Sequence, residues 1–419
     1  MLSVKQPIIW DPDGKFRKRV LAMRRAAIVS PVRTAVGKFG GALRSVSADT
    51  LGATVIEELV RRTNIDPSKI DDVVFGQGYP NGENPAIGRY AAMKAGLPIE
   101  VPGYQLDRRC GSGLQAVLSA AMMIQTANAD VVIAGGAESM SSAEFYTPGA
   151  RWGTRIGSAP LYDRITRARE RASPEERFGF ISGMIETAEN LARKHNISRE
   201  EQDEFALMSQ QRAVAAWDMG KFAEEVVPVS VPGRGKEAIK VERDEGLRPN
   251  VSLEELKALK TVQACGTVTA GNASQQNDGA AACLVVAEDK LDELGLEPLL
   301  YLKGWAVAGC APSTMGIGPV PAVAKVFKKT GLGWKDIDLV ELNEAFAAQV
   351  LAVLREWGWD DRARLNVNGS GISLGHPVAA TGVRILTTLA YEMKRRRARY
   401  GLETMCIGGG QGLAAIFER

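Results

Sequence analysis

The sequence predicts an α/β protein that consists of two copies of one folding unit. Residues 70–74 (IDDVV) are similar to residues 337–341 (IDLVE), 267 positions further along, and nearly the same offset, 266, carries Cys110 onto His376. Each of these two residues precedes a helical pattern that starts with small residues, and an apolar strand pattern with glycines follows each helix. A pattern that recurs at a fixed offset indicates a repeated structural unit, so we expect duplicated α/β halves.

The predicted elements alternate along each copy. The apolar run at 26–39 (AAIVSPVRTAVGKF) predicts a buried strand that runs into a loop, and 48–63 (ADTLGATVIEELVRRT) has the spacing of an amphipathic helix. Strand patterns follow at 70–77 and 129–139, and the helix pattern GSGLQAVLSAAMMI lies between them. In the second copy, PVAATGVRILTTLAYEM predicts the matching helix and MCIGGGQGLAAIFE the matching strand. Such alternation is typical of α/β folds.

The chain is expected to divide into three parts. The stretch from about 145 to 245 lacks the alternation and is rich in charge, as in YDRITRARERASPEER. Because loops held by a rigid scaffold commonly carry binding residues, we expect an inserted cap that supplies substrate contacts. The predicted division is an N-terminal extension at 1–24, a first half at 25–296 that includes the cap, and a second half at 297–419.

Composition and charge argue against several functional classes. Lysine and arginine number 52 against 49 aspartate and glutamate, and the two signs are interspersed, so nucleic acid is not an expected partner. No apolar run reaches the roughly 18 residues that a membrane span needs. The N-terminal stretch lacks the apolar core of a secretory signal. The five cysteines form neither a disulfide framework nor a metal motif, so we expect reduced thiols, no metal and a cytoplasmic location.

Cys110 is the candidate nucleophile. It follows Arg108 and Arg109 and lies at the expected N-terminus of a helix that begins near Gly113. A helix N-terminus and neighbouring cations lower the pKa of a thiol, which favours the reactive thiolate. The alternative is a small cysteine buried in the core, which is the usual fate of a free cysteine.

His376 is the candidate base and one of only two histidines. It lies in the turn GISLGHP, where Pro377 prevents a position inside a helix and marks a helix start. A neutral imidazole there can take the thiol proton and later return it. The alternative is a structural histidine. The other histidine, His195 in RKHNISREEQD, is expected to be a solvated surface residue.

Cys406 opens the segment CIGGGQG and is the third candidate. The glycines that follow it let the backbone approach a ligand closely and aim N–H groups at an oxygen. A glycine run alone is weak evidence, but its combination with Cys110 and His376 predicts a reactive site.

The chain resembles the thiolases, the family that makes or cleaves 3-ketoacyl-CoA thioesters. The resemblance rests on an ordered set of motifs from about residue 25 to the C-terminus: CGSGLQAV, GGAESMS, GTVTAGNAS, NDGAA, MGIGPVPA, NEAFAAQ, NVNGSGISLGHP and CIGGGQG. It implies a fold of two repeated α/β halves in a layered αβαβα arrangement with an inserted loop domain. It also implies an acyltransferase that works by CoA-dependent thiolysis or the reverse Claisen condensation.

The resemblance implies a role for each catalytic residue. Cys110 would carry the acyl group, and His376 would activate it and contribute to an oxyanion hole. Cys406 would exchange a proton with the α-carbon of acetyl-CoA. Asn343 would hold a water that, with His376, stabilises the enolate oxygen. The backbone N–H groups of Cys110 and Gly408 would form the oxyanion hole for the acyl-enzyme carbonyl.

The resemblance further implies the ligands and the assembly. Coenzyme A and acyl-CoA would be substrates, with no permanently bound cofactor, and fatty acid metabolism, including β-oxidation, would be the context. Ser274 would contact the pantetheine, Met315 and Phe346 would lie near the acyl pocket, and Arg234 would meet the CoA phosphates. Each of these four has a competing role in ordinary packing or as a solvated loop residue. Thiolases are homodimers or homotetramers.

Two departures from the family pattern concern the site. Asp107 stands where many thiolases have asparagine, and its charge would oppose thiolate formation unless Arg108 or Arg109 offsets it. The stretch GMIETAEN begins with Gly183 where many short-chain members carry a histidine, which weakens the resemblance to an acetoacetyl-CoA enzyme.

Three alternative functions remain open at this stage. A decarboxylating ketoacyl synthase of the same superfamily would pair its cysteine with two histidines, and His195 is badly placed to be one of them. A silent acyl-CoA binding member of the fold would lack turnover, because a fold alone does not prove activity. A papain-like hydrolase would share only the Cys/His pair and lacks its usual sequence context here.

Overall fold

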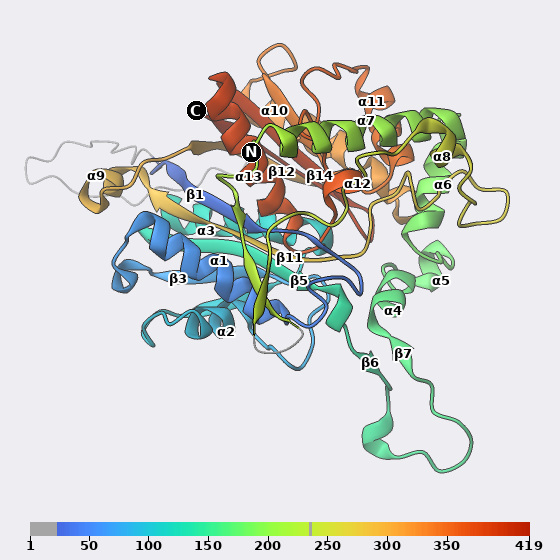
Figure 1. Cartoon of the computed structure of the whole chain (residues 1–419), viewed down its shortest axis with the longest axis horizontal. Helices are drawn as coiled ribbons and strands as arrows, with labels where there is room; N and C mark the ends of the chain where they lie inside the picture. Colours follow the sequence, from blue (N-terminus) through green and yellow to red (C-terminus); the bar gives the residue numbers. More distant parts are fainter. Residues whose placement is uncertain (1–22, 234–236) are drawn as a thin grey trace, which may run out of the picture.

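The computed structural model describes residues 23–233 and 237–419, and one large mixed sheet organises them (Figure 1). The first half contributes the strands β1 (Ala26–Thr34), β3 (Asp72–Gly76), β4 (Gly103–Leu106), β5 (Val131–Ser139) and β11 (Asn277–Ala287). The second half contributes β12 (Leu300–Gly309), β13 (Leu339–Leu342), β14 (Tyr400–Ile407) and β15 (Gln411–Glu418). The order across the sheet is β13-β14-β15-β12-β1-β11-β5-β3-β4.

The two halves pair their strands in the same way. In the first half, β3 is parallel to β5, β5 is antiparallel to β11, and β11 is antiparallel to β1. In the second half, β13 is parallel to β14, β14 is antiparallel to β15, and β15 is antiparallel to β12. The halves meet edge to edge where β1 pairs with β12, at Ala27 with Tyr301 and Ile28 with Leu300. The pairing pattern confirms the predicted duplicated α/β fold.

Helices α3 (Ser112–Gln125) and α13 (Thr381–Arg396) form the middle layer. Both belong to one hydrophobic cluster with strand residues of both halves, such as Cys283 and Phe417. The two helices approach closely, because a Cβ on Gly382 of α13 would lie 2.2 Å from the backbone nitrogen of Leu114 in α3. A side chain larger than hydrogen at Gly382 would therefore push the helices apart.

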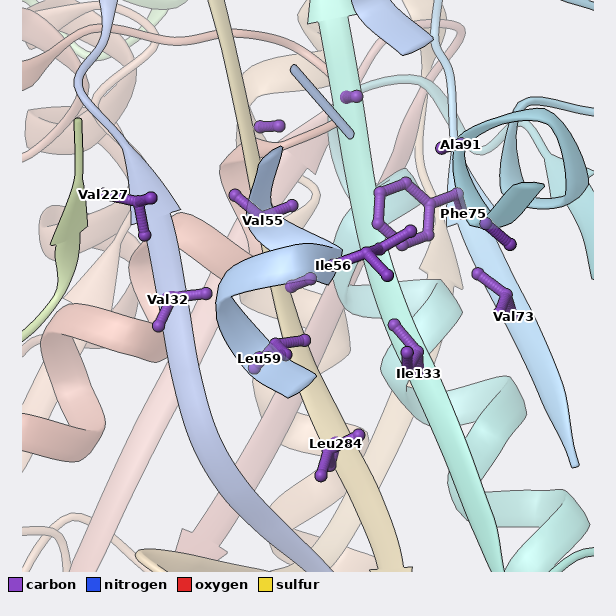
Figure 2. Close-up of a cluster of buried hydrophobic side chains, with 14 of the residues drawn as sticks. Val32, Val55, Ile56, Leu59, Val73, Phe75, Ala91, Ile133, Val227 and Leu284 are labelled. Carbon is purple, nitrogen blue, oxygen red and sulfur yellow. The ribbon is translucent and has the colours of Figure 1, made fainter. Parts of the chain in front are cut away.

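Outer helices cover the opposite faces of the sheet. Helices α1 (Ala48–Thr63) and α2 (Ile87–Lys94) cover the first half, while α10 (Pro319–Thr330) and α11 (Ala347–Trp357) cover the second (Figure 1). In Figure 2, Ile56 and Leu59 of α1 lie against strand residues that include Phe75, Ile133 and Leu284. Buried clusters lie outside the strands of the first half, between the two halves, and outside the strands of the second half. The strands of the two halves therefore form two layers, and the packing order is helix, sheet, helix, sheet, helix.

The inserted region contains more regular structure than the sequence suggested. It holds a projecting hairpin of β6 (Phe145–Tyr146) and β7 (Tyr162–Asp163), followed by α4 (Arg164–Glu170), α5 (Glu175–Phe178), α6 (Met184–Lys194) and α7 (Arg199–Asp218) (Figure 1). Residues of α6 and α7 pack in the same cluster as α11. The short strands β8 (Val226–Val227), β9 (Val229–Pro232) and β10 (Ala238–Val241) close the region.

Helix α7 shows why periodicity failed there. Its buried face includes polar and small side chains, such as Gln202, Asp203 and Ala206, so apolar residues do not recur at the helical period. Its start is nevertheless marked by a capping box in which Ser198 and Glu201 satisfy each other's backbone N–H groups.

The remaining elements are short: β2 (Gly37–Lys38), α8 (Leu253–Lys257), α9 (Leu291–Leu294) and α12 (Gly371–Leu374). Within the described residues, no helix combines the length and the apolar character that crossing a bilayer requires.

Candidate active site

A cavity of about 350 Å³ lies where both halves and the inserted region meet. Residues from the first half, the second half and the helices α4 and α6 line it together. The cavity wall contains six of the predicted site residues: Cys110, Ser274, Met315, Phe346, His376 and Gly408. Residues that are 266 positions apart in the sequence therefore face one space.

A short turn at the start of α3 presents Cys110. The backbone nitrogen of Arg109 donates to Asp107 Oδ1 at 2.7 Å, and the Ser112 hydroxyl donates to the Arg109 carbonyl at 2.7 Å. Arg109 has a positive φ of 49°, which is uncommon for a residue with a side chain and occurs often at functional sites. The carboxylate of Asp107 thus stabilises the turn that holds Cys110.

The pKa of the Cys110 thiol differs from the sequence-based prediction. Burial raises this pKa, although the backbone N–H of Gly408 and the charge of Arg109 act to lower it. The expectation that the helix start and the arginines lower the pKa is therefore wrong, because loss of hydration outweighs them. The resting thiol is protonated, so its reaction requires a base.

His376 meets that requirement through its tautomer. Its Nδ1 lies 2.6 Å from the hydroxyl oxygen of Thr381, and the same hydroxyl donates to the carbonyl of Pro377 at 3.0 Å. Because Thr381 has only one hydroxyl proton, Nδ1–H must donate to Thr381, which leaves Nε2 as a free lone pair. Burial, then the charges of Arg384 and Arg169, lower the pKa of His376 to about 3, so the imidazole is neutral.

The predicted helix start at Pro377 is wrong by four residues. A turn follows the proline, and α13 begins at Thr381, whose backbone nitrogen donates to the Pro377 carbonyl at 3.0 Å. The backbone nitrogen of His376 donates to Asn277 Oδ1 at 2.8 Å. The extra turn places the Thr381 hydroxyl within hydrogen-bond distance of His376 Nδ1, where it selects the tautomer.

Cys406 lies at the end of β14, fully buried and behind the cavity wall. Burial, followed by the proximity of Cys110 and Cys310, raises the pKa of the Cys406 thiol well above its ordinary value. In the glycine run that follows, Gly410 has a φ of 88°, and a Cβ there would lie 2.4 Å from the Cys310 carbonyl oxygen. Glycine is therefore required for this turn, which brings the Gly408 N–H to the Cys110 sulfur.

Asn343 follows β13 and is also fully buried. Its backbone nitrogen donates to the Thr404 carbonyl at 3.0 Å, but within the described residues neither polar atom of its side chain has a hydrogen-bond partner. An unsatisfied buried amide is costly and calls for a polar ligand or water. Ala345 and Phe346, which follow it closely, line the cavity.

Comparison with known proteins identifies the family. Residues 26–289 match the family model described as Thiolase, N-terminal domain, and residues 296–419 match Thiolase, C-terminal domain. The chain belongs to the thiolase family. This thiolase is an acyltransferase, and the known reaction of its family is thiolytic cleavage of 3-ketoacyl-CoA or the reverse condensation.

Individual relatives agree over nearly their full length. An acetyl-CoA acetyltransferase of Chromobacterium violaceum is 48% identical over 94% of this chain and 99% of its own. The crystal structure of the Bacillus anthracis acetyl-CoA acetyltransferase has a TM-score of 0.90 and 42% identity, and it covers 95% of this chain and 99% of its own. Human mitochondrial 3-ketoacyl-CoA thiolase in complex with CoA has a TM-score of 0.88 and 40% identity, covering 94% and 98%.

Sequence reasoning missed Glu138, which is buried between the loop that follows β3 and the turn that follows His376. Glu138 accepts hydrogen bonds from the backbone nitrogens of Gly78, Tyr79 and Ala379 at 2.9, 3.2 and 3.1 Å. Gly78 and Tyr79 follow β3 of the first half, whereas Ala379 belongs to the His376 turn of the second. One carboxylate therefore fixes loops of both halves. The motif GGAES contains Glu138, but no feature of this motif predicts that Glu138 joins the two halves.

Glu138→Gln is expected to reduce kcat/KM by about tenfold to a hundredfold, because its amide group would oppose backbone N–H donors with a further donor.

Burial raises the pKa of Glu138 to about 7. The folded state then binds the proton more tightly than the unfolded state. The free energy of unfolding of the wild type should therefore decrease by roughly 3 kcal/mol as the pH rises from about 4.5 to about 7. Thermal unfolding at pH 5 to 8 should show this fall in wild type but not in the variant. Parallel profiles would contradict it.

The two remaining predictions for site residues have different outcomes. His195 is not a solvated surface residue: its side chain is 11% exposed, at the end of α6 with Glu356 at 3.7 Å, and it does not line the cavity. A histidine next to lysine and arginine reads as exposed because sequence does not show the packing of α6. Arg234 lies outside the described residues.

Proposed function

We propose that Cys110, His376 and Cys406 perform both half-reactions of this thiolase on 3-ketoacyl-CoA and CoA. One observation carries the proposal: the free Nε2 lone pair of His376 and the protonated thiol of Cys110 share one cavity. A neutral imidazole with this tautomer can accept the thiol proton. The thiol needs this base, because burial raises its pKa and disfavours loss of the proton to water.

In the first half-reaction, His376 takes the proton of Cys110, and the sulfur attacks C3 of the substrate. The oxygen on C3 becomes negative and accepts hydrogen bonds from the backbone N–H groups of Cys110 and Gly408. Both N–H groups already hydrogen-bond to the Cys110 sulfur. The C2–C3 bond then breaks, and C2 takes a proton from Cys406 to give acetyl-CoA. His376 and a water on Asn343 stabilise the enolate oxygen during this step.

In the second half-reaction, the thiol of a second CoA gives its proton to the Cys406 thiolate. The CoA sulfur then attacks the thioester carbonyl carbon, the bond between that carbon and the Cys110 sulfur breaks, and His376 returns its proton to Cys110. The products are acetyl-CoA and an acyl-CoA two carbons shorter, and all three side chains recover their starting protonation states. The high pKa of Cys406 suits it to donate a proton first and to recover one later.

CoA thioesters are the ligands that we propose, without a permanently bound cofactor. The related human thiolase was crystallised with CoA. In this chain, Ser274, Met315 and Phe346 line the same cavity as Cys110, so a pantetheine arm that passes Ser274 would reach the nucleophile. We further propose a cytoplasmic location, because the mechanism needs reduced thiols and all five cysteines are unpaired. We also propose a role in fatty acid metabolism, including β-oxidation, because the proposed substrate is a 3-ketoacyl-CoA.

We also propose that the chain divides into an N-terminal extension at 1–24, most of which lies outside the described residues, a first half at 25–296 with its inserted cap, and a second half at 297–419. Each half supplies one member of the Cys110 and His376 pair, and the insertion supplies part of the wall. The experiment that tests the function is cleavage of acetoacetyl-CoA and a long-chain 3-ketoacyl-CoA, measured with wild type and Cys110→Ala. Turnover without CoA dependence would contradict it.

We propose that the protein forms a homodimer or homotetramer. The projecting hairpin exposes large apolar side chains, including Trp152 at 85% and Ile156 at 96%, and the edge strand β4 leaves Tyr104 exposed. Exposed apolar groups of this kind mark interaction surfaces. Analytical ultracentrifugation at micromolar concentration should show a dimer or tetramer, and Trp152→Ser with Ile156→Ser should shift the distribution to smaller species. A wild-type monomer would refute the proposal.

A further inference from the structure

Two guanidinium groups face the active-site cavity near the reacting atoms. Arg109 precedes the nucleophile, and Arg169 comes from α4 of the inserted region; both are half-buried and line the cavity. The charge of Arg169 acts on both Cys110 and His376, and that of Arg109 acts on Cys110. Both cations therefore lie close to the position that the acyl chain would occupy.

Neither cation has an acidic partner among the described residues. Arg169 Nε donates to the Tyr79 hydroxyl at 3.3 Å, and Arg109 Nη1 donates to the Gly78 carbonyl at 3.5 Å. The neighbouring arginines of α4 differ: Arg164 pairs with Glu144 at 2.6 Å, and Arg167 pairs with Glu170 at 3.3 Å. On α4, the arginine that lines the cavity is the one without a carboxylate.

The nearby acids are engaged elsewhere. Glu138 accepts three backbone N–H groups, and Glu186, at the cavity wall, accepts the backbone nitrogen and hydroxyl of Ser182. Asp163 caps α4 by accepting from Ile165 and Thr166. A guanidinium group in a water-poor cavity favours a carboxylate that it can bind with two parallel hydrogen bonds.

The rest of this wall is mainly apolar. It includes Met140, Ala168, Ala172 and Val378, so it suits a hydrocarbon chain rather than a phosphate-rich group. We propose that the acyl chain of the preferred substrate ends in a carboxylate, which Arg169, assisted by Arg109, binds. This inference rests on the proposed function and specifies its substrate class: short 3-oxodicarboxylyl-CoA.

The chemistry is that of the proposed mechanism with a charged chain. The Cys110 sulfur bonds to C3, the C2–C3 bond breaks, and C2 receives a proton, which releases acetyl-CoA. CoA then releases a dicarboxylyl-CoA two carbons shorter, and its far carboxylate takes no part in bond making. The reaction that supplies the substrate therefore either oxidises C3 of a dicarboxylic acyl-CoA to a ketone or joins CoA to a 3-oxodicarboxylic acid.

The test compares two substrates of equal chain length, 3-oxoadipyl-CoA and the uncharged 3-oxohexanoyl-CoA. Wild type is expected to prefer the charged substrate in kcat/KM by at least about tenfold, and Arg169→Gln should reduce this preference by about tenfold to a hundredfold. Arg169→Lys should retain part of it. Arg167→Gln, on the same helix and paired with Glu170, is the control and should keep the wild-type preference.

Each outcome supports or overturns the inference. A wild type that cleaves the uncharged substrate equally well or better would overturn it while leaving the thiolase function intact. An equal loss on both substrates in Arg169→Gln would overturn it too, and would show that Arg169 acts on the catalytic pair. A wild type that cleaves acetoacetyl-CoA or the long-chain 3-ketoacyl-CoA but neither of these two substrates would overturn the inference alone. If wild type cleaves none of the four substrates, the proposed function fails, and the inference fails with it.

Discussion

Cys110→Ala is expected to reduce CoA-dependent cleavage of 3-ketoacyl-CoA by at least about 10⁴-fold. The variant removes the sulfur that we propose forms the acyl-enzyme, and Cys406 is not expected to replace it, because its thiol is fully buried and its pKa lies well above normal. The loss should fall on kcat, because the cavity in which we propose that CoA thioesters bind stays in place. The measurement is the decrease in the magnesium-enolate absorbance of acetoacetyl-CoA and of a long-chain homologue.

Two further readouts make this result specific. Substrate without CoA should leave one acyl group on the peptide that contains Cys110, and mass spectrometry should find none on this peptide in Cys110→Ala. Cys265→Ala is the matched control, because Cys265 is an exposed free cysteine outside the cavity, and its activity should equal that of wild type. Acylation of Cys406 in place of Cys110, or turnover in Cys110→Ala near that of wild type, would show that the nucleophile is wrongly assigned.

Cys406→Ala is expected to separate the two halves of the reaction. Carbon–carbon cleavage should fall by about 10² to 10⁴-fold, because the proposed mechanism assigns the protonation of C2 to Cys406. Transfer of an acetyl group between acetyl-CoA and labelled CoA breaks no carbon–carbon bond, and in the variant the CoA thiol can exchange its proton with solvent instead of with Cys406. This exchange should therefore remain within about tenfold of wild type. The measurement is the ratio of label exchange to cleavage of acetoacetyl-CoA at the same enzyme concentration.

Cys310→Ala provides the neighbouring control. Cys310 is close enough to raise the pKa of Cys406, its own pKa is raised to about 11 by burial, and the proposed mechanism gives it no proton to move. Its ratio of exchange to cleavage should match that of wild type. If Cys406→Ala loses exchange and cleavage to the same extent, Cys406 supports the structure of the site rather than the carbon chemistry.

The duplication could be predicted from the sequence because both copies repeat the same order of strand, helix and glycine turn. The match of 70–74 with 337–341 corresponds to β3 and β13, which hold equivalent places in the two halves. Helix α7 could not be predicted as a buried helix, since residues such as Gln202 and Asp203 point inward. Periodicity detects a buried face only when that face is apolar.

The chemistry of the site was harder to predict than its residue types. Cys110 was recognised, but its pKa depends on burial, which no local motif encodes. The tautomer of His376 depends on Thr381, five residues away across an unexpected turn. Glu138 joins loops from both halves, so its role exists only after the halves have docked. The unpaired state of Arg169 likewise depends on where α4 lies.

The close approach of α3 and α13 has a mechanical consequence. In the part of the chain that the structure describes, β1 and β12 share only two residue pairs, so the spacing of Cys110 and His376 depends on the packing of these two helices together with the Glu138 and Asn277 hydrogen bonds to the His376 turn. Contact at Gly382 and Leu114 fixes that spacing from behind, out of reach of the substrate. A single added methyl group at Gly382 would push the two helices apart and increase the distance between Cys110 and His376. A substitution in the core would then lower activity without any change to the residues that would touch the ligand.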